Sequence, residues 1–545
     1  MPSPRPLTSL ERVAPWIAGL LIALPVVVFH YPPMADVPMH EAVVGLLRHW
    51  GDPSYVPAGL YDLNLGLGNQ LFYFLILPLA YVAPIGVATK LVVAITLFAL
   101  PPATARLADH LSVTRWSAVI IAPLGLGWLF FWGLLSNLMG LDVYLLMLPA
   151  LDRLSDRPTP KEVAKVCAWM VLIHFTHDLM MLVAAGTLVV FAVSTWRGWR
   201  ENLVRVLPVA LAAVLALTTT TLATRLLNKR HVKLLGYGWT GIDHKLRVIP
   251  SILFGGSDRG SRLLILFVCA VPTILFAVER WRTRDRKAQT GREAAHHFRF
   301  EIVGVLLVLG YLVAPIKVNA TTLVYQRFLP PAWILLTVTA CTRAPLDRPW
   351  RLPRMLAAFV PFAPLLTAWP TFAANGRLYS DLDATITHMD RNSSYIVVEL
   401  GPDGDSGLVA PANTVGHVVA ALGGRSFHDF TSSEIAPVYQ RREAQWITAY
   451  DRMNGTPYEM MPSYDLTRFR YALLHTPDEG IANVAVVALA PDARMIFRQG
   501  EWTVMESTLP LVPIDALDEP TPTPAPKTLR ERCIEAVARI RNARR

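Results

Sequence analysis

The sequence predicts a mainly α-helical protein, a polytopic transmembrane bundle of about 11 helices with a C-terminal external α/β domain. Of its 545 residues, 53% are hydrophobic and 17% are charged, and the mean hydropathy is +0.37. The apolar residues lie in runs of about 15 to 22, close to the ~20 that a helix needs to cross a bilayer. After Ala374 the composition changes to that of a soluble domain.

The net charge of +10 does not indicate nucleic-acid binding in this chain. Most Lys and Arg residues lie in short links between apolar runs, and such a distribution reports membrane topology. Arg5 and Arg12 precede the first apolar run, residues 14–31, so we expect a cytoplasmic N-terminus and an external loop after this run. The run has no small-residue cleavage site, and we expect it to be retained as a helix.

The four cysteines predict neither disulfides nor a metal site. Cys167, Cys269 and Cys341 fall inside apolar runs, and Cys533 lies in the tail. Their spacing matches neither a disulfide framework nor a zinc motif.

Residues 32–90 are interpreted as one long external loop. The short apolar run at 71–84 contains Pro78. If this run crossed the membrane, Arg106 and Arg115 would face outward, against the preference of basic links for the cytoplasm. We therefore expect residues 71–84 to lie in the outer leaflet or to dip into it.

With this choice, the basic links of the remaining chain fall on the cytoplasmic side. The most basic link, residues 280–299, is predicted to be cytoplasmic. The predicted crossings are residues 14–31, 90–107, 114–133, 138–154, 163–176, 178–195, 206–222, 263–278, 301–316, 329–341 and 355–374.

The chain is expected to divide into three parts. Residues 1–374 form the transmembrane domain, residues 375–515 an external soluble domain, and residues 516–545 a Pro/Thr linker with a basic tail. The pattern of the soluble domain predicts a helix at 412–422 and strands at 394–400, 471–475, 484–490 and 502–506.

One polar motif follows the first crossing directly: Asp36-Val37-Pro38-Met39-His40-Glu41. If Pro38 occupies the first turn of a short helix, Asp36 lies near its N-cap and His40 and Glu41 follow in that turn. A base, an imidazole and a second carboxylate would then meet at the membrane surface. The alternative is a solvated loop in which Asp36 merely caps a helix, and the motif alone leaves both open.

Other polar residues fall at the external ends of predicted crossings, where they are expected to line one cavity. They are His174, His177, Asp178, Lys229, Lys233, Asp243, His244, Lys245, Lys317 and Arg327, with Gln326 next to Arg327. A guanidinium such as that of Arg327 pairs bidentately with phosphate oxygens. The alternatives are that the histidines are interfacial and that Arg327 snorkels from a helix end. Asp36, His177 and Asp178 are also possible ligands of a divalent metal ion, although their spacing is not a zinc signature.

This layout resembles the GT-C class of polytopic glycosyltransferases, which use polyprenyl-phosphate sugar donors on the external face. The resemblance covers about residues 10–374 and rests on the following pieces. They are the acidic motif at Asp36, the Gly68-Asn69-Gln70-Leu71-Phe72-Tyr73 entry into a juxtamembrane helix, the turn at His174, the Gln326-Arg327-Phe328 segment and the C-terminal α/β domain. The chain lacks the paired Asp-Asp or Glu-rich motif common in the class.

The resemblance implies a membrane enzyme that moves a sugar from a lipid-phosphate donor to an external acceptor. Transfer requires a base for the acceptor proton and stabilisation of the departing phosphate. Asp36 is the expected base, assisted by His40 and Glu41. Arg327, Lys229, Lys233, His174, His177 and Gln326 are the expected substrate-binding residues.

The expected partners are a polyprenyl-phosphate-linked sugar and membrane lipid, without nucleic acid, and the expected location is the inner membrane of a bacterium. The competing hypothesis is a non-enzymatic lipid or polysaccharide transporter or a membrane scaffold. A transporter is expected to contain internal repeats and charged residues near the bilayer midplane. The sequence displays neither pattern.

Overall fold

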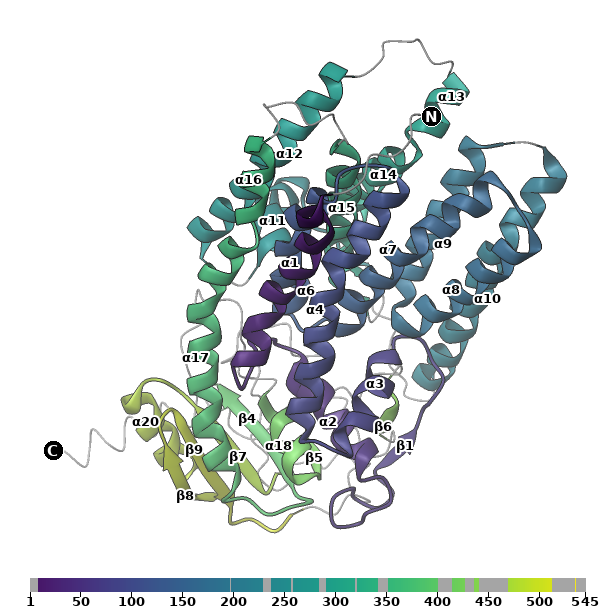
Figure 1. Ribbon diagram of the computed structural model, residues 1–545. Helices are drawn as coiled ribbons and strands as arrows, with labels where there is room; N and C mark the ends of the chain where they lie inside the picture. Colours follow the sequence, from purple (N-terminus) through teal and green to yellow (C-terminus); the bar gives the residue numbers. More distant parts are fainter. Residues whose placement is uncertain are drawn as a thin grey trace.

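The computed structural model describes residues 8–196, 198–228, 237–255, 258–283, 291–318, 321–341, 351–399, 414–426, 436–440, 469–511 and 535. A long helical bundle occupies most of the molecule, and the C-terminal sheet lies at one of its ends (Figure 1). The bundle helices are α1 (Ser9–Val28), α4 (Ile85–His110), α5 (Trp116–Ile121), η1 (Ala122–Leu126), α6 (Trp128–Phe131), α7 (Leu135–Asp156), α8 (Pro160–Thr176), α9 (Asp178–Ser194), α10 (Trp199–Asn228), α11 (Ile242–Phe254), α12 (Arg259–Thr283), α13 (Gly291–His297), α14 (Arg299–Val313), η2 (Tyr325–Phe328), α15 (Leu329–Ala340), α16 (Arg351–Phe359) and α17 (Phe362–Ile386).

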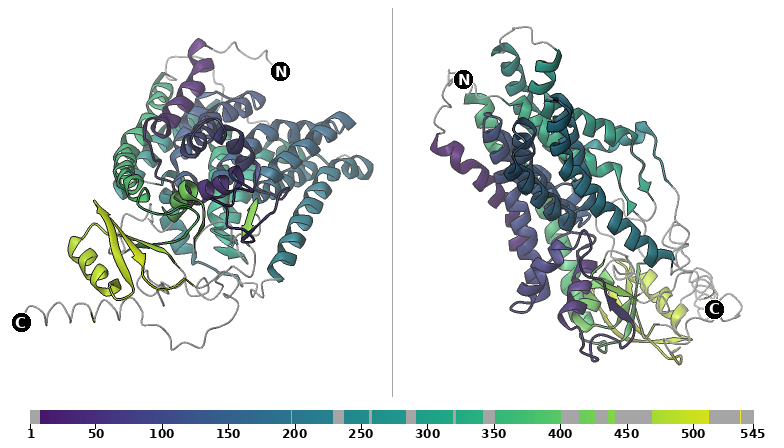
Figure 2. Two further views of the ribbon diagram at one scale, coloured as in Figure 1. Left: turned by 90° about the horizontal axis from the view of Figure 1, so that it is seen from below. Right: turned by 90° about the vertical axis from the view of Figure 1, so that its right-hand side faces the viewer.

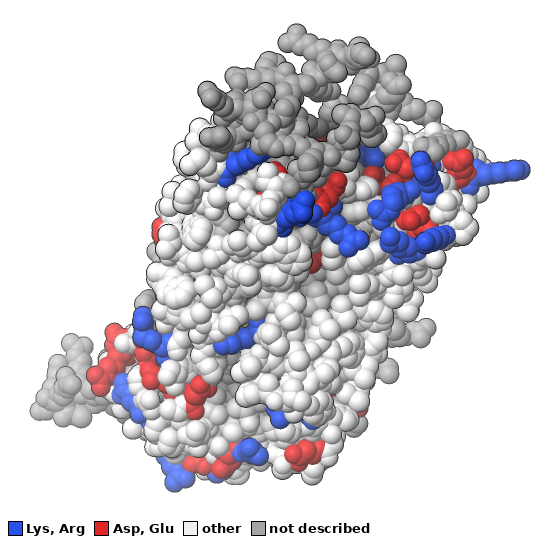
Figure 3. All heavy atoms as spheres, viewed as in Figure 1, with Lys and Arg blue, Asp and Glu red and all other residues white. Residues whose placement is uncertain are grey.

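Every predicted crossing coincides with a helical segment. In the described part of the chain, six helices are long and apolar enough to span a bilayer: Ser9–Val28, Ile85–His110, Leu135–Asp156, Trp199–Thr219, Arg259–Val278 and Leu352–Ile386. Most charged side chains on the face seen in Figure 3 lie toward the two ends of the molecule. The chain is therefore an integral membrane protein with a mainly α-helical fold.

The last crossing is longer than predicted. We expected its helix to end at Ala374, whereas α17 continues to Ile386. The polar residues after Ala374 are tolerated because the helix packs there against the C-terminal sheet, where the Trp502 indole donates to the Leu378 carbonyl at 3.0 Å. Helices α11 and α13 were not predicted.

The C-terminal sheet has the strand order β5-β4-β7-β9-β8. Strand β4 (Ser394–Glu399) runs parallel to β5 (Arg425–Ser426) and β7 (Tyr471–His475), while β9 (Trp502–Ser507) is antiparallel to β7 and to β8 (Ala493–Gln499). Helix α18 (Val415–Leu422) confirms the predicted helix. Together these elements confirm the α/β class.

The predicted strand at 484–490 is wrong, because this segment belongs to helix α20 (Glu479–Leu489). Asp478 caps the helix by accepting from the Gly480 and Ile481 N–H groups at 2.7 and 3.1 Å. The buried residues Ala482, Ala485 and Ala488 recur every three positions, which is a helical period. The run of valines in the same segment suggested a strand and outweighed this signal.

The first long loop contains the predicted short helix, α2 (Val37–Arg48), with Pro38 in its first turn. Strand β1 (Tyr61–Leu63) and helix α3 (Leu71–Ala80) follow. β1 pairs antiparallel with β6 (Val438–Gln440), so the first loop and the C-terminal part share a small sheet. A hairpin of β2 (Lys317–Val318) and β3 (Thr321–Thr322) precedes η2.

The two ends of the bundle carry different segments. Helices α2 and α3, strand β1 and the C-terminal sheet lie at one end, and α13 lies at the other (Figure 1). The right-hand view in Figure 2 shows the same separation. The predicted external loop and the predicted cytoplasmic basic link thus occupy opposite ends.

This separation leads to a labelling prediction. In a background without the four native cysteines, Ala58→Cys in the first loop should react with a membrane-impermeant thiol reagent added to intact cells. Lys161→Cys, at the start of α8, should react only after the membrane is opened. Both positions are exposed, so the difference reports sidedness. Labelling of Lys161→Cys from outside would reverse the topology.

Candidate functional site

Asp36 is held at the end of the bundle by backbone contacts with the turn after α6. The N–H groups of Ala35 and Asp36 donate to the carbonyls of Phe131 and Trp132 at 2.8 and 3.1 Å. Gly133 closes over Asp36 with φ +76°, a conformation that favours glycine. A Cβ there would lie 2.7 Å from the Asp36 nitrogen.

The capping alternative for Asp36 is wrong. It occupies the N-cap position of α2, but its side chain makes no capping hydrogen bond, and its ψ of −8° differs from the extended backbone of a usual cap. The side chain is partly exposed. The Asp36 carboxylate therefore does not cap α2.

Arg327 is brought close to Asp36 from a distant part of the chain. It lies in η2, ahead of α15, and burial lowers its pKa to about 10 while the nearby Asp36 carboxylate opposes that shift. The guanidinium remains charged at neutral pH. A carboxylate and a largely buried cation thus lie within electrostatic range of each other at one end of the bundle.

His177 contacts the Arg327 guanidinium, and Asn137 contacts His177. The Nη1 of Arg327 donates to the Nε2 of His177 at 2.8 Å, and the Nδ2 of Asn137 lies 3.3 Å from the same nitrogen. Burial, and then the charge of Arg327, lower the pKa of His177 well below its ordinary value. His177 is therefore a neutral acceptor that orients the guanidinium.

His40 supports the site from the other side. Its Nδ1 lies 2.8 Å from the Tyr73 hydroxyl, and the ring also bonds to the Gly133 backbone. Burial lowers the pKa of His40 to about 3, so the imidazole is neutral at pH 7. The Tyr73 hydroxyl in turn lies within electrostatic range of Asp36. His40 thus orients Tyr73 and the Gly133 turn.

Glu41 points toward a different partner. Its Oε2 lies 2.7 Å from the Nδ1 of His417 in α18, and both side chains are nearly buried. Asp36 and His40 are four residues apart and share one side of α2, whereas Glu41 is rotated by about 100° from His40. Glu41 therefore belongs to the contact between α2 and the C-terminal domain.

His174 and Asp178 join the first loop to the turn between α8 and α9. The Nδ1 of His174 lies 2.6 Å from the Oδ1 of Asp178. The Asp178 N–H donates to the Asn69 side chain at 3.0 Å, and the Asn69 N–H donates to the His174 carbonyl at 3.2 Å. Gly68 lies over the Asp178 carboxylate. A Cβ added at Gly68 would lie 2.5 Å from the Oδ2 of Asp178. This junction fixes the start of α3 and, through it, Tyr73.

The predicted metal ligands do not form a suitable donor set. The Nε2 of His177 accepts from the Arg327 guanidinium, and its Nδ1 lies 3.3 Å from the Met180 nitrogen. The Asp178 carboxylate is engaged with His174. In the described residues, no group of three or more His, Cys, Asp or Glu side chains is arranged to hold a metal.

The remaining predicted site residues have different outcomes. Gln326 is buried beside Arg327, and its Oε1 has no hydrogen-bond partner among the described residues. Lys229 and Lys233 lie outside the described residues.

Tyr73 and Asn137 were not predicted from the sequence as site residues. Lys245 was expected to line the external cavity. The Lys245 ammonium is buried and donates to the Leu312 and Ala314 carbonyls at 2.8 and 2.7 Å. It also lies 4.7 Å from the centre of the Tyr325 ring, so it fixes the segment that carries Arg327. A polar residue beside an apolar run was the available signal for Asn137.

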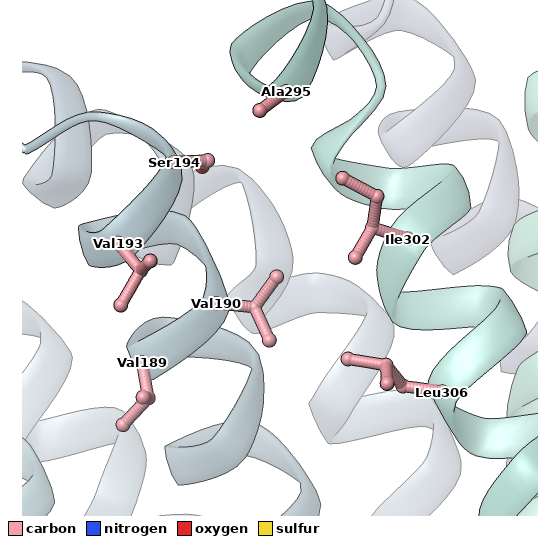
Figure 4. A pocket seen from close by; sticks show the side chains of 7 residues that line it. All are labelled: Val189, Val190, Val193, Ser194, Ala295, Ile302 and Leu306. Carbon is pink, nitrogen blue, oxygen red and sulfur yellow. The ribbon is translucent and has the colours of Figure 1, made fainter. Parts of the chain in front are cut away.

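An apolar groove of about 340 Å³ lies between α9 and α14 (Figure 4), lined by Val189, Val190, Val193, Ser194, Ala295, Ile302 and Leu306. It begins twelve residues after His177, or about 18 Å along α9. The groove is therefore separate from the polar cluster around Asp36 and Arg327.

Burial of His40 makes the stability of the protein depend on pH. Below pH ~6.5 the unfolded chain binds a proton at this imidazole, whereas the folded chain does so only near its lowered pKa of about 3. Stability should therefore fall as the pH drops below ~6.5, by up to about 1.4 kcal/mol per pH unit. The fall in Tm between pH 7 and 5 in detergent should be smaller in His40→Gln.

His244→Gln is the matched control, because His244 is exposed. Its Tm should follow the wild-type pH dependence. An unchanged pH dependence in His40→Gln would mean that His40 binds its proton equally well in the folded state.

Comparison with known proteins identifies a relative by fold. No protein-family model matches the chain, and no curated protein matches it. The crystal structure of ArnT from Cupriavidus metallidurans bound to undecaprenyl phosphate is 12% identical, covers 91% of this chain and 98% of its own, and has a TM-score of 0.52. The apo structure of the same protein is 12% identical, covers 93% and 98%, and has a TM-score of 0.51. At this identity the likeness shows the fold alone, and the chain has the fold of ArnT.

Proposed function

We propose that the protein is a membrane glycosyltransferase that moves a sugar from a polyprenyl-phosphate donor to an acceptor. The reaction takes place at the end of the bundle that carries α2 and the C-terminal domain. This end faces outward from the inner membrane of a bacterium. Membrane lipid surrounds the bundle, and the lipid-linked donor reaches the site from the membrane.

The observation that carries the proposal is that Asp36 lies within electrostatic range of Arg327. This carboxylate and this guanidinium come from distant parts of the chain and lie at the expected external end, in a fold shared with ArnT over 91% of the chain. Burying a charged arginine is costly unless the charge is paired and hydrogen-bonded. A phosphate monoester or diester is an anion that such a site accommodates.

The two residues divide the work of transfer between them. Asp36 accepts the proton of the acceptor hydroxyl as the acceptor oxygen forms its bond to the anomeric carbon of the sugar. The bond between that carbon and the phosphate oxygen breaks, and the lipid phosphate leaves with the electron pair. Arg327 stabilises the charge that develops on the phosphate.

Neighbouring residues keep these groups in place. His177 accepts from one of the five N–H groups of Arg327 and so sets the plane of the guanidinium. Gln326 and the turn at His174 are proposed to border the donor. Lys229 and Lys233 are proposed, on the basis of the sequence, to add positive charge for the same phosphate.

The first test concerns Asp36. Asp36→Asn keeps the size of the side chain but removes its basic charge, so transfer should fall by at least about 100-fold while Tm stays nearly unchanged. The assay uses purified protein in nanodiscs with radiolabelled polyprenyl-phosphate sugars and extracted cell-envelope acceptors. His40→Ala and Glu41→Gln should reduce transfer less.

Asp62 is an exposed residue of strand β1 in the same loop. Asp62→Asn is therefore the matched control and should transfer at the wild-type rate. Near-normal transfer by Asp36→Asn would exclude Asp36 as the base. Donor binding without transfer to any acceptor would favour the transporter hypothesis.

The second test concerns Arg327. Arg327→Lys keeps the charge but loses the planar fork, and Arg327→Ala loses both, so donor affinity should fall in that order. A hydrogen bond to a charged group contributes about 1.5 to 3 kcal/mol, which corresponds to roughly 10- to 100-fold in Kd. Titration of undecaprenyl phosphate into protein in nanodiscs measures the affinity.

Arg247 provides the matched control. It is exposed and pairs with Asp243 within α11, so Arg247→Lys and Arg247→Ala should bind the lipid phosphate as the wild type does. Equal affinities in the wild type and both Arg327 variants would mean that Arg327 only snorkels, and the phosphate site would have to be sought elsewhere.

A further inference from the structure

We infer that helix α18 of the C-terminal domain positions Asp36, acting through two contacts with α2. This inference rests on the proposed function, because it assigns Asp36 the task that must be positioned. Helices α2 and α18 lie side by side at the end of the bundle (Figure 1). The two helices are more than 300 residues apart in the sequence.

The first contact is between the two helix backbones. Gly416 of α18 lies on the peptide of Pro38, so closely that a Cβ at this glycine would collide with the Pro38 carbonyl and the Met39 nitrogen. About two turns further along α2, Gly45 faces Ala420, whose Cα would lie 3.2 Å from an added Cβ. The crossing therefore leaves no room for a side chain at Gly416.

The second contact is the pair of Glu41 and His417. The two groups meet at 2.7 Å. The rings of Tyr31 and Tyr379 lie against the His417 ring, with centroids 5.2 and 4.8 Å away. The Tyr31 hydroxyl donates to the carboxylate of Asp383 at 2.5 Å. Glu41 and His417 are thus held among aromatic rings, where a hydrogen bond is stronger than in water.

Both contacts bear directly on Asp36. Pro38 follows Asp36 by two residues, and its ring restricts the backbone between them. The His40 N–H donates to the Asp36 carbonyl at 3.2 Å and continues this rigid first turn. Arg327, by contrast, is carried by η2. A shift of α18 would therefore move Asp36 relative to Arg327.

The C-terminal domain is itself fixed to the first loop, which makes α18 a firm support. The Gly424 N–H donates to the Tyr55 carbonyl at 2.8 Å, and the Tyr55 hydroxyl donates to the Val419 carbonyl at 2.9 Å. The Asn392 side chain donates to the Pro53 carbonyl at 2.7 Å. The domain is thus a structural part of the reaction site.

Gly416→Ala tests the backbone contact. The added methyl group should displace Pro38 and lower kcat by about 10- to 100-fold, because small displacements of a reacting group are costly. The Kd for undecaprenyl phosphate should stay within about twofold of the wild type, since Arg327 is not displaced. Amide hydrogen exchange of residues 37–48 should become faster.

Gly376→Ala is the matched control. Gly376 lies in α17, and an added Cβ there meets no atom within 4 Å. This variant should match the wild type in kcat, Kd and amide exchange. A wild-type kcat in folded Gly416→Ala would overturn the inference.

Glu41 supplies an independent test if Gly416→Ala does not fold. Glu41→Gln keeps an oxygen that accepts from His417, whereas Glu41→Leu removes it, so kcat should fall less in Glu41→Gln than in Glu41→Leu, with the Kd for undecaprenyl phosphate unchanged in both. A similar kcat in both variants and the wild type would exclude the pair as a positioning contact.

The amide exchange separates this inference from the proposed function. If the wild type transfers no sugar, the proposed function fails, and exchange alone decides the positioning of α2. Faster exchange of residues 37–48 in Gly416→Ala than in Gly376→Ala would support it. Equal exchange in the two variants would refute it.

Discussion

Two backbone hydrogen bonds join Asp36 and its neighbour to the bundle, those from Ala35 and Asp36 to the carbonyls of Phe131 and Trp132. They fix the end of the first loop against a turn of the bundle, independently of any side chain. Gly133 makes this close approach possible. Because the backbone is fixed first, neighbouring side chains can be devoted to orienting the functional groups.

The histidines near the site illustrate this division. His40 and His177 are buried, and burial lowers the pKa of both. A neutral imidazole offers one donor and one acceptor in fixed directions. Here these directions orient Tyr73 and Arg327. Both histidines thus act through hydrogen-bond geometry, and the carboxylate and the guanidinium carry the charge.

Much of the bundle could be predicted from the sequence, because apolar runs and basic links report directly on the membrane. The short helix α2 was also predictable, since Pro38 marks its first turn. The partners of individual side chains were not. Glu41 was grouped with Asp36 because the two are close in sequence, yet its partner His417 comes from the C-terminal domain. Contacts of this range leave no local pattern in the chain.

The two-stranded sheet of β1 and β6 has a consequence for biogenesis. Its first strand is synthesised with the first loop, whereas its partner strand emerges from the ribosome more than 370 residues later. Until then the first loop has an unpaired edge, and Glu41 has no His417 beside it. The contacts that the C-terminal part makes with the first loop are therefore completed only after the bundle has been synthesised. The part of the protein that is proposed to catalyse transfer is thus the last part to assemble.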